Sequence, residues 1–197
     1  MDSYPPPQWL PGTNAWSGRA EAALPPSDPE LRIRPIEPGD QRALQDGFEH
    51  LSEMSRYYRF HSPMRQLSNG LAHYLTHVDG IDHVALVAFE PGASRSDAAV
   101  GVAVARFIRD RRDPQSAELA ITVVDHAQGH GVARRLLQAL APAARDRGIS
   151  TFTMSVLAGN KRVRQLLKSL GATSRGSSGD VTTFALPVAA LLDSTSH

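Results

Sequence analysis

The stretch ELAITVVDHAQGHGVARRLLQALAPAARDR, residues 118–147, decides the fold. It opens with an apolar run over 119–124 that is typical of a strand, and it closes with a long helical pattern. Between them lies a loop with two glycines, Gly129 and Gly131. Glycine lets a backbone approach a bound group closely, and the first N–H groups of a helix carry partial positive charge without an intrahelical partner. The loop is therefore a candidate phosphate or pyrophosphate site, or else an ordinary strand-to-helix turn.

Two familiar phosphate loops do not fit this stretch. The P-loop ends in Gly-Lys-Ser or Gly-Lys-Thr, whereas Gly131 is followed by Val132 and Ala133. The dinucleotide-binding fingerprint needs a third glycine where this chain has Arg134. What remains is Gln-x-x-Gly-x-Ala, which begins at Gln128 directly after the expected strand.

This pattern resembles the acyl-CoA loop of the GNAT acetyltransferases, the Gcn5-related superfamily, whose usual form is Gln/Arg-x-x-Gly-x-Gly/Ala. A second marker of that family is an asparagine followed by a helix and a glycine, here Asn160 and Gly171. The resemblance spans roughly residues 31–186. It implies an α/β fold with one GNAT-like domain, whose mixed, mostly antiparallel central sheet splays at the strand 118–124. The order of the expected elements, with hairpin strands early and strand–helix–strand–helix late, also predicts helices on both faces of a mixed sheet.

The resemblance also implies where acetyl-CoA, the co-substrate, would bind. Main-chain groups of the strand would pair with the pantetheine arm, the glycine loop would wrap the pyrophosphate, and Asn160 would contact the far end of the arm. The implied residues are Ile121, Thr122, Val123, Gln128, Gly129, His130, Gly131, Val132, Ala133, Arg134 and Asn160. A basic pair at the start of the helix, Arg134 and Arg135, supports an anion there independently, because positive charge is unfavourable at a helix N-terminus.

Glu118 is the candidate catalytic residue. It is an acid in a strand that otherwise reads as buried, and a buried carboxylate is costly unless it is paired or functional. In GNAT enzymes a glutamate at this point often acts as general base; the alternative is a salt bridge to a nearby arginine. Many family members place a tyrosine that protonates the leaving thiolate where this chain has Leu167, and a proline where it has Asp125.

The segment LSEMSRYYRFHSP, residues 51–63, is similar to a stretch in the bacterial protein lysine acetyltransferases that modify acyl-CoA synthetases. There it flanks the acceptor site; the alternative is a structural helix turn with its aromatic rings in the core. The matching residues are Ser55, Arg56, Tyr57, Arg59 and Phe60. Three functions follow: a protein lysine acetyltransferase, a small-molecule amine acetyltransferase, or a non-catalytic acyl-CoA-binding regulatory module. Direct attack in a ternary complex is expected for an enzyme, because the chain has no cysteine to form a thiol acyl-enzyme.

Composition narrows the class of protein. With 197 residues, 41% hydrophobic residues and a net charge of +1, the chain is long enough for one buried core and gives no argument for a nucleic-acid or membrane partner. The absence of cysteine excludes disulfides and zinc fingers and fits a cytoplasmic protein. His73 and His77 have a spacing that suits a metal, but no third ligand is near, so no metal is expected. A homodimer is expected only by analogy with the family.

The chain divides into a proline-rich tail over 1–30, a domain over 31–187 and a short tail over 188–197. The first tail carries Trp9 and Trp16, which either hang on a flexible arm or dock on the protein. Residues 82–90 and 98–108 are expected to form an antiparallel hairpin. Four arginines that follow are expected to lie on a solvated turn: Arg106, Arg109, Arg111 and Arg112.

Overall fold

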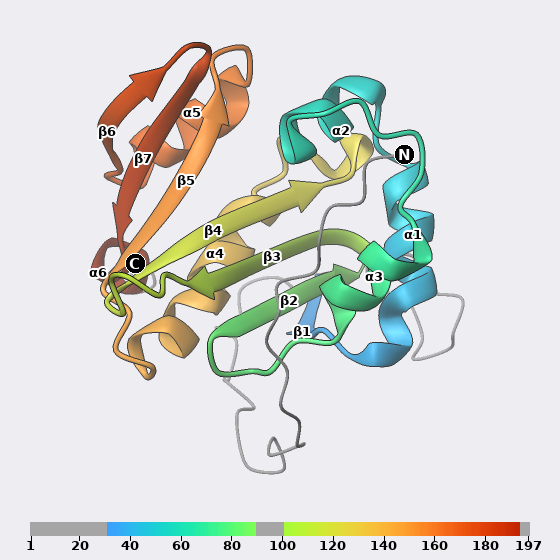
Figure 1. The fold of residues 1–197 in the computed structure, drawn as a ribbon, viewed down its shortest axis with the longest axis horizontal. Coiled ribbons are helices and arrows are strands. Elements are labelled where there is room, and N and C mark those ends of the chain that lie inside the picture. Colours follow the sequence, from blue (N-terminus) through green and yellow to red (C-terminus); the bar gives the residue numbers. More distant parts are fainter. Residues whose placement is uncertain (1–30, 90–100, 194–197) are drawn as a thin grey trace.

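A computed structural model describes residues 31–89 and 101–193, which form an α/β fold around one seven-stranded sheet (Figure 1). The strands are β1 (Arg32–Pro35), β2 (His83–Phe89), β3 (Gly101–Arg109), β4 (Ser116–Val123), β5 (Thr151–Leu157), β6 (Thr173–Ser178) and β7 (Val181–Pro187). The helices are α1 (Gln41–Glu49), α2 (Glu53–Phe60), α3 (Asn69–Thr76), α4 (Val132–Arg145), α5 (Lys161–Ser169) and α6 (Val188–Asp193), with short 3-10 turns η1 (Pro38–Asp40) and η2 (Asp125–Ala127). The predicted tail over 1–30, with both tryptophans, lies outside the described residues.

The sheet is mixed and mostly antiparallel, as predicted. Its strand order is β1-β2-β3-β4-β5-β7-β6, and every neighbouring pair is antiparallel except β4 and β5. The predicted hairpin is confirmed by the antiparallel pairing of β2 with β3, from His83 opposite Ile108 to Phe89 opposite Gly101. Helix α4 lies behind the sheet in Figure 1, while α3 lies in front of it and α1 beside it.

The predicted splay lies between β4 and β5. Strand β4 pairs with β3 from Ala117 to Val123, but it pairs with β5 only at its first three residues, Ser116, Ala117 and Glu118. Beyond Glu118 the two strands separate, and Figure 1 shows β5 leaning away from β4. The edge of β4 past this point therefore has backbone groups with no strand partner on that side, and such groups need a partner from elsewhere.

Helix α4 supplies the largest apolar face of the core. Leu136, Leu137 and Leu140 have no exposed surface, and they repeat at the spacing that keeps side chains on one side of a helix. The sequence predicts a kink at Pro142, or a helix end near Leu140 followed by a restart, and the second alternative is wrong because α4 is continuous from Val132 to Arg145. Burial on both sides of Pro142, at Leu140 and Ala144, stabilises the last turn although proline donates no backbone hydrogen bond.

The packed part of the chain extends past the boundary predicted at residue 187. Where a tail over 188–197 is expected, residues 188–193 form α6, with Val188 and Leu191 buried. Helix α6 packs against α4. With 6 residues, α6 is too short for a helical periodicity of apolar residues to be recognised in the sequence.

The prediction of a solvated arginine turn is wrong for Arg106. Arg111 and Arg112 are exposed, but Arg106 lies inside β3 with 4% of its surface exposed. Its guanidinium donates to the main-chain oxygen of Leu75, 2.9 Å away, and to Nε2 of His83, 3.1 Å away. Because arginine only donates, Nε2 of His83 must carry a lone pair, so this imidazole is neutral.

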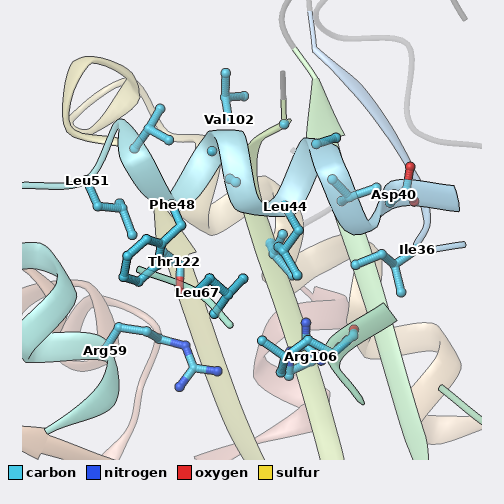
Figure 2. Close-up of a pocket in the computed structure, with 18 of the residues that line it drawn as sticks. Ile36, Asp40, Leu44, Phe48, Leu51, Arg59, Leu67, Val102, Arg106 and Thr122 are labelled. Atoms are coloured by element: carbon cyan, nitrogen blue, oxygen red, sulfur yellow. Dashed lines mark hydrogen bonds between the residues drawn. The ribbon is translucent and has the colours of Figure 1, made fainter. Parts of the chain in front are cut away.

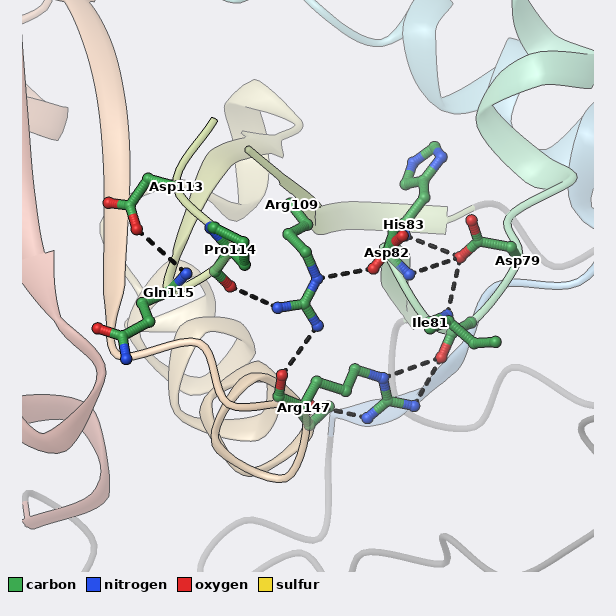
Figure 3. Close-up of polar contacts among 11 residues, drawn as sticks. Asp79, Ile81, Asp82, His83, Arg109, Asp113, Pro114, Gln115 and Arg147 are labelled. Atoms are coloured by element: carbon green, nitrogen blue, oxygen red, sulfur yellow. Dashed lines mark hydrogen bonds and ion pairs between the residues drawn. The ribbon is translucent and has the colours of Figure 1, made fainter. Parts of the chain in front are cut away.

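Arg109 is also a structural residue rather than a solvated one. Its Nε donates to the carboxylate of Asp82 at 2.7 Å, and its Nη2 donates to the main-chain oxygen of Arg147 at 2.8 Å (Figure 3). Arg147 in turn donates twice to the main-chain oxygen of Gly80. The two guanidinium groups thereby join the loop before β2 to the end of α4.

We expect the stability of the protein to fall as the pH drops from about 6.5 to about 4. Burial, and then the charge of Arg106, lower the pKa of His83 from 6.5 to about 4. The unfolded chain takes up the His83 proton at higher pH than the folded chain does, so the stabilisation present above pH 6.5 is lost as the pH falls through the folded value. The loss amounts to about 3 kcal/mol at most.

Urea unfolding of wild type and His83→Gln across this pH range measures the effect. Carboxylates titrate in both proteins, so the informative quantity is the difference between their unfolding free energies. This difference should shift against wild type as the pH falls, and a constant difference would mean that His83 is not held neutral.

A close helix–strand contact predicts a strong effect of Gly47 on stability. A Cβ atom at Gly47, in α1, would lie 2.7 Å from the main-chain oxygen of Gly101 in β3. Gly47→Ala should therefore lower the unfolding free energy by about 1–3 kcal/mol, through overpacking against backbone that cannot rotate away. Gly70→Ala, in α3, is the matched control because nothing lies within 4 Å of the added atom. Chemical denaturation of both variants checks this, and equal stabilities would contradict it.

Candidate functional site

A groove opens where β4 and β5 separate. It has a volume of about 690 Å³, and it is bordered by β4, the loop 125–131 and the starts of α4 and α5, with α2 across from them. The structure brings together here all of the predicted cofactor-binding residues except one: Ile121, Thr122, Val123, Gln128, Gly129, Gly131, Val132, Ala133, Arg134 and Asn160. His130 is exposed and does not line the groove.

The glycine loop ends in an uncapped helix. Gly129 and Gly131 have φ values of +87° and +79°, which L side chains rarely adopt. Gly131 is the N-cap of α4 and has no side chain to accept from the helix. The first N–H groups of this 14-residue helix therefore have no partner within it and face the groove, as an anion site requires.

Basic side chains surround this end of the groove. Arg134 donates to the hydroxyl of Ser169, 2.9 Å away, and lines the groove together with Lys161 and Arg162. The last two were missed by sequence reasoning, although they directly follow the marker Asn160. Three cationic side chains close to one helix N-terminus favour a ligand with several negative charges, such as a pyrophosphate.

Gln128 holds the loop in place by its side chain. Its Nε2 donates to the main-chain oxygen of Val123 at 3.0 Å and to the hydroxyl of Ser55 at 3.3 Å, and its Oε1 accepts from Arg162 at 2.7 Å. One amide thus joins the end of β4, helix α2 and helix α5. The Gln128 side chain is therefore used inside the protein, where it fixes the start of the glycine loop.

Asp125, which replaces a frequent proline of the family, binds the start of α2. Its carboxylate accepts from the main-chain nitrogen and the hydroxyl of Ser52, at 2.8 and 2.9 Å, and from the hydroxyl of Ser55 at 3.0 Å. Burial opposes the ionised form, but these hydrogen bonds outweigh it and lower the pKa of Asp125. The segment 51–63 is therefore attached to the glycine loop by a charged acceptor.

Helix α2 has the structural role considered for it, and it also borders the groove. Arg56 is structural, since its guanidinium lies over the ring of Phe48, 4.6 Å from the centroid, and Phe60 packs against the core. Tyr57 is exposed, whereas Ser55 and Arg59 line the groove. The helix therefore packs on the core by one side and forms a groove wall by the other.

Tyr58 is a groove residue that sequence reasoning missed. A Cβ atom at Gly159 would lie 2.8 Å from the Tyr58 hydroxyl, so the Tyr58 ring of α2 lies directly against the loop after β5. Asn160 beside it caps α5, with its Oδ1 accepting from the nitrogen of Val163 at 3.2 Å. The contact is made between positions about a hundred residues apart in sequence, and no local pattern carries it.

Glu118 is exposed, and the prediction that it is buried is wrong. It lies at the last paired position of β4 and β5, opposite Thr153, where the sheet opens. Among the described residues it makes no ion pair, so the salt-bridge alternative is not seen either. Its charge acts on Arg59: burial lowers the pKa of that guanidinium, and the Glu118 carboxylate opposes the shift.

Leu167 has an apolar side chain that is buried in the core, so it cannot donate a proton in the groove. It has 1% of its surface exposed and belongs to the core, so the position at which many GNAT enzymes place a tyrosine is used here for packing.

No metal site is found in the part of the chain that the structure describes, since no three His, Cys, Asp or Glu side chains gather there. The His73 and His77 rings stack with centroids 3.5 Å apart. Within the same residues, no helix is both long and apolar enough to cross a membrane.

Comparison with known proteins agrees with this geometry. The chain is 35% identical over 142 residues to acetyltransferase Pat of Mycolicibacterium smegmatis, which covers 71% of this chain but only 40% of that protein. The GNAT domain of S. lividans PAT superposes with a TM-score of 0.72 at 32% identity, over 80% of this chain and 90% of that one. Spermidine N-acetyltransferase from Vibrio cholerae, solved with CoA and spermine, shares the fold at 18% identity, with a TM-score of 0.64 over 84% and 99% of the two chains. Residues 30–173 match the acetyltransferase (GNAT) domain, and the chain therefore belongs to the GNAT acetyltransferase family.

Proposed function

We propose that this protein is an acetyl-CoA-dependent N-acyltransferase that acetylates a lysine side chain of a protein. The observation that carries the proposal is the groove itself, because unpaired backbone of β4 runs into a glycine loop and an uncapped helix N-terminus. A pantetheine arm carries amides that pair with strand backbone, and a pyrophosphate fits a helix N-terminus. The similarity to Pat and to the S. lividans PAT domain supports a protein acceptor.

The binding roles follow the order of residues along the groove. Main-chain groups of Ile121, Thr122 and Val123 would pair with the pantetheine arm. The main chain over 128–134 would hold the pyrophosphate, with Arg162 and Lys161 adding positive charge. Asn160 would contact the far end of the arm with its amide nitrogen, because its Oδ1 already caps α5.

Glu118 would act on the acceptor. A lysine ammonium has a pKa of about 10.4 in solution and must lose a proton before its nitrogen attacks. Glu118 would accept that proton directly or through a water. Its exposure at the point where the sheet opens suits an acceptor that arrives on the surface of another protein. Acetyl-CoA supplies an activated acyl group whose thiolate leaves readily, so Leu167 in place of a tyrosine is compatible with turnover.

The scarcity of acidic side chains in the groove argues against a small polyamine as acceptor. Asp125 is the one carboxylate among the described residues that line it, and both its oxygens already accept from Ser52 and Ser55. A polycation would need more free negative charge than this in the site.

Release of CoA from acetyl-CoA tests the proposal, and this chain adds no background to a thiol-reactive dye because it has no cysteine. Acetyl-CoA binding is expected by calorimetry, with CoA release that depends on a lysine-containing protein such as an acyl-CoA synthetase. Turnover with spermidine alone would favour the small-amine enzyme, and binding without any turnover would favour a regulatory module. Absence of acetyl-CoA binding would contradict the proposal.

A further inference from the structure

A second cavity lies beside the groove, on the face of the sheet that α1 and α3 cover (Figure 2). Its walls are mainly apolar and include Leu44, Phe48, Leu67 and Val102. It shares Thr122 and Arg59 with the groove, so the two spaces adjoin at β4. Thr122 follows Glu118 on the same face of this strand, at alternate positions.

The cavity has the size of a short acyl tail. Its volume of about 60 Å³ accommodates roughly four groups of water size. The proposed thioester would lie at the side of β4 on which Thr122 and Glu118 are found, which is where the cavity meets the groove. An acyl chain longer than acetyl would extend from there into the cavity.

Two arginines, Arg59 and Arg106, are among the residues that line this cavity (Figure 2). Arg106 donates only to neutral acceptors, the oxygen of Leu75 and Nε2 of His83. Arg59 lies over the ring of Phe60, 4.9 Å from the centroid, and makes no hydrogen bond or ion pair to any of the described residues.

Among the described residues, no carboxylate within the cavity balances these charges. Its one acid, Asp40, is held by Arg34 in a two-pronged ion pair with distances of 2.6 and 2.7 Å. Glu118 acts on Arg59 from outside the cavity, without a direct contact. A half-buried guanidinium that lacks a partner favours an anion, and a carboxylate matches its planar fork best.

The positive charge of Arg59 and Arg106 determines which reactant can bind in the cavity. A lysine ammonium or a polyamine would be repelled by Arg59 and Arg106, so the acceptor must approach from the exposed side of Glu118. An aliphatic chain that ends in a carboxylate matches both the apolar walls and the cations.

We infer that this cavity is an acyl pocket for dicarboxylic acyl-CoA thioesters such as succinyl-CoA, in which Arg59 binds the distal carboxylate. The inference rests on the proposed function. The transfer would form the amide bond between the acceptor nitrogen and the thioester carbonyl carbon. The C–S bond would break with its electron pair on sulfur, CoA would leave as the thiolate, and the proton lost by the ammonium would pass through Glu118 to solvent. The product carries a carboxylate in place of the ammonium.

Comparison of succinyl-CoA with butyryl-CoA tests the inference, because the two acyl chains have equal carbon number and differ in the terminal charge. In wild type, kcat/KM should favour succinyl-CoA about tenfold or more, with a parallel difference in Kd by calorimetry. Arg59→Met should lower this ratio about tenfold, and Arg59→Lys should keep most of it. Arg42→Met is the matched control, since Arg42 lies on α1 with 87% of its side chain exposed.

The outcomes separate the inference from the proposed function. Acetyl-CoA binding and turnover without a succinyl preference, or a preference that Arg59→Met leaves unchanged, would overturn the acyl pocket alone. Faster acetyl transfer to a free amino acid, lost in Arg59→Met, would assign the cavity to the acceptor's carboxylate and also overturn it. Failure to bind any acyl-CoA would contradict the proposed function itself.

Discussion

Glu118→Gln should lower kcat by roughly two to four orders of magnitude, the usual contribution of a general base. The amide keeps the size and the polarity of the side chain but cannot take the proton of the acceptor ammonium. Because Glu118 does not line the groove, the Kd of acetyl-CoA should stay the same within error. Steady-state kinetics at saturating acetyl-CoA, together with calorimetry, measures the two effects separately.

Stability provides the control for this variant. Glu118 is exposed and makes no ion pair among the described residues, so its substitution should change the unfolding free energy by less than about 0.5 kcal/mol. Glu118→Asp, which keeps the carboxylate but draws it back, should retain part of the activity. If Glu118→Gln turns over like wild type, another group or solvent removes the proton.

Gly131→Trp should weaken acetyl-CoA binding by about a hundredfold or more, which corresponds to roughly 3 kcal/mol. Nothing lies within 4 Å of a Cβ atom at Gly131, so the indole would project into the groove instead of into the protein. It would cover the first N–H groups of α4, where the pyrophosphate is proposed to bind. Calorimetric titration with acetyl-CoA checks this result.

The same helix offers the matched control. Gly148, just past the other end of α4, also has a positive φ, +73°, and open space around its Cβ position. Gly148→Trp therefore imposes the same backbone strain and the same bulk away from the groove, and it should bind acetyl-CoA like wild type. Equal binding by both variants would exclude the loop as the cofactor site. Equal loss in both would show that the strain, not the position, is responsible.

The local parts of the fold and the groove are predictable from the sequence, because the signals are contiguous. The strand, the glycine loop and helix α4 follow one another within residues 116–145, and their patterns suffice to place them. The splay was implied by resemblance, and the pairing of β4 with β5 confirms it. These features depend on residues that are neighbours in the sequence, or on the two family markers that begin at Gln128 and Asn160.

The errors come from contacts that the sequence does not show. Glu118 was expected to be buried because its strand is apolar, but its exposure depends on where β5 leaves β4. Arg106 was expected in solvent because it carries charge, but a distant carbonyl and His83 satisfy it inside the sheet. Tyr58 reaches Gly159 only in three dimensions. Each of these is a long-range relation, which periodicity and local propensity do not encode.

The attachment of Ser52 and Ser55 to Asp125 bears on how the two substrates bind together. The loop proposed to hold the acyl donor and the helix proposed to border the acceptor share one carboxylate, so ordering one of them also orders the other. Linkage makes such an effect reciprocal, and each substrate should tighten the binding of its partner. The ternary complex of enzyme, acyl donor and acceptor should therefore form more readily than the two separate binding constants predict.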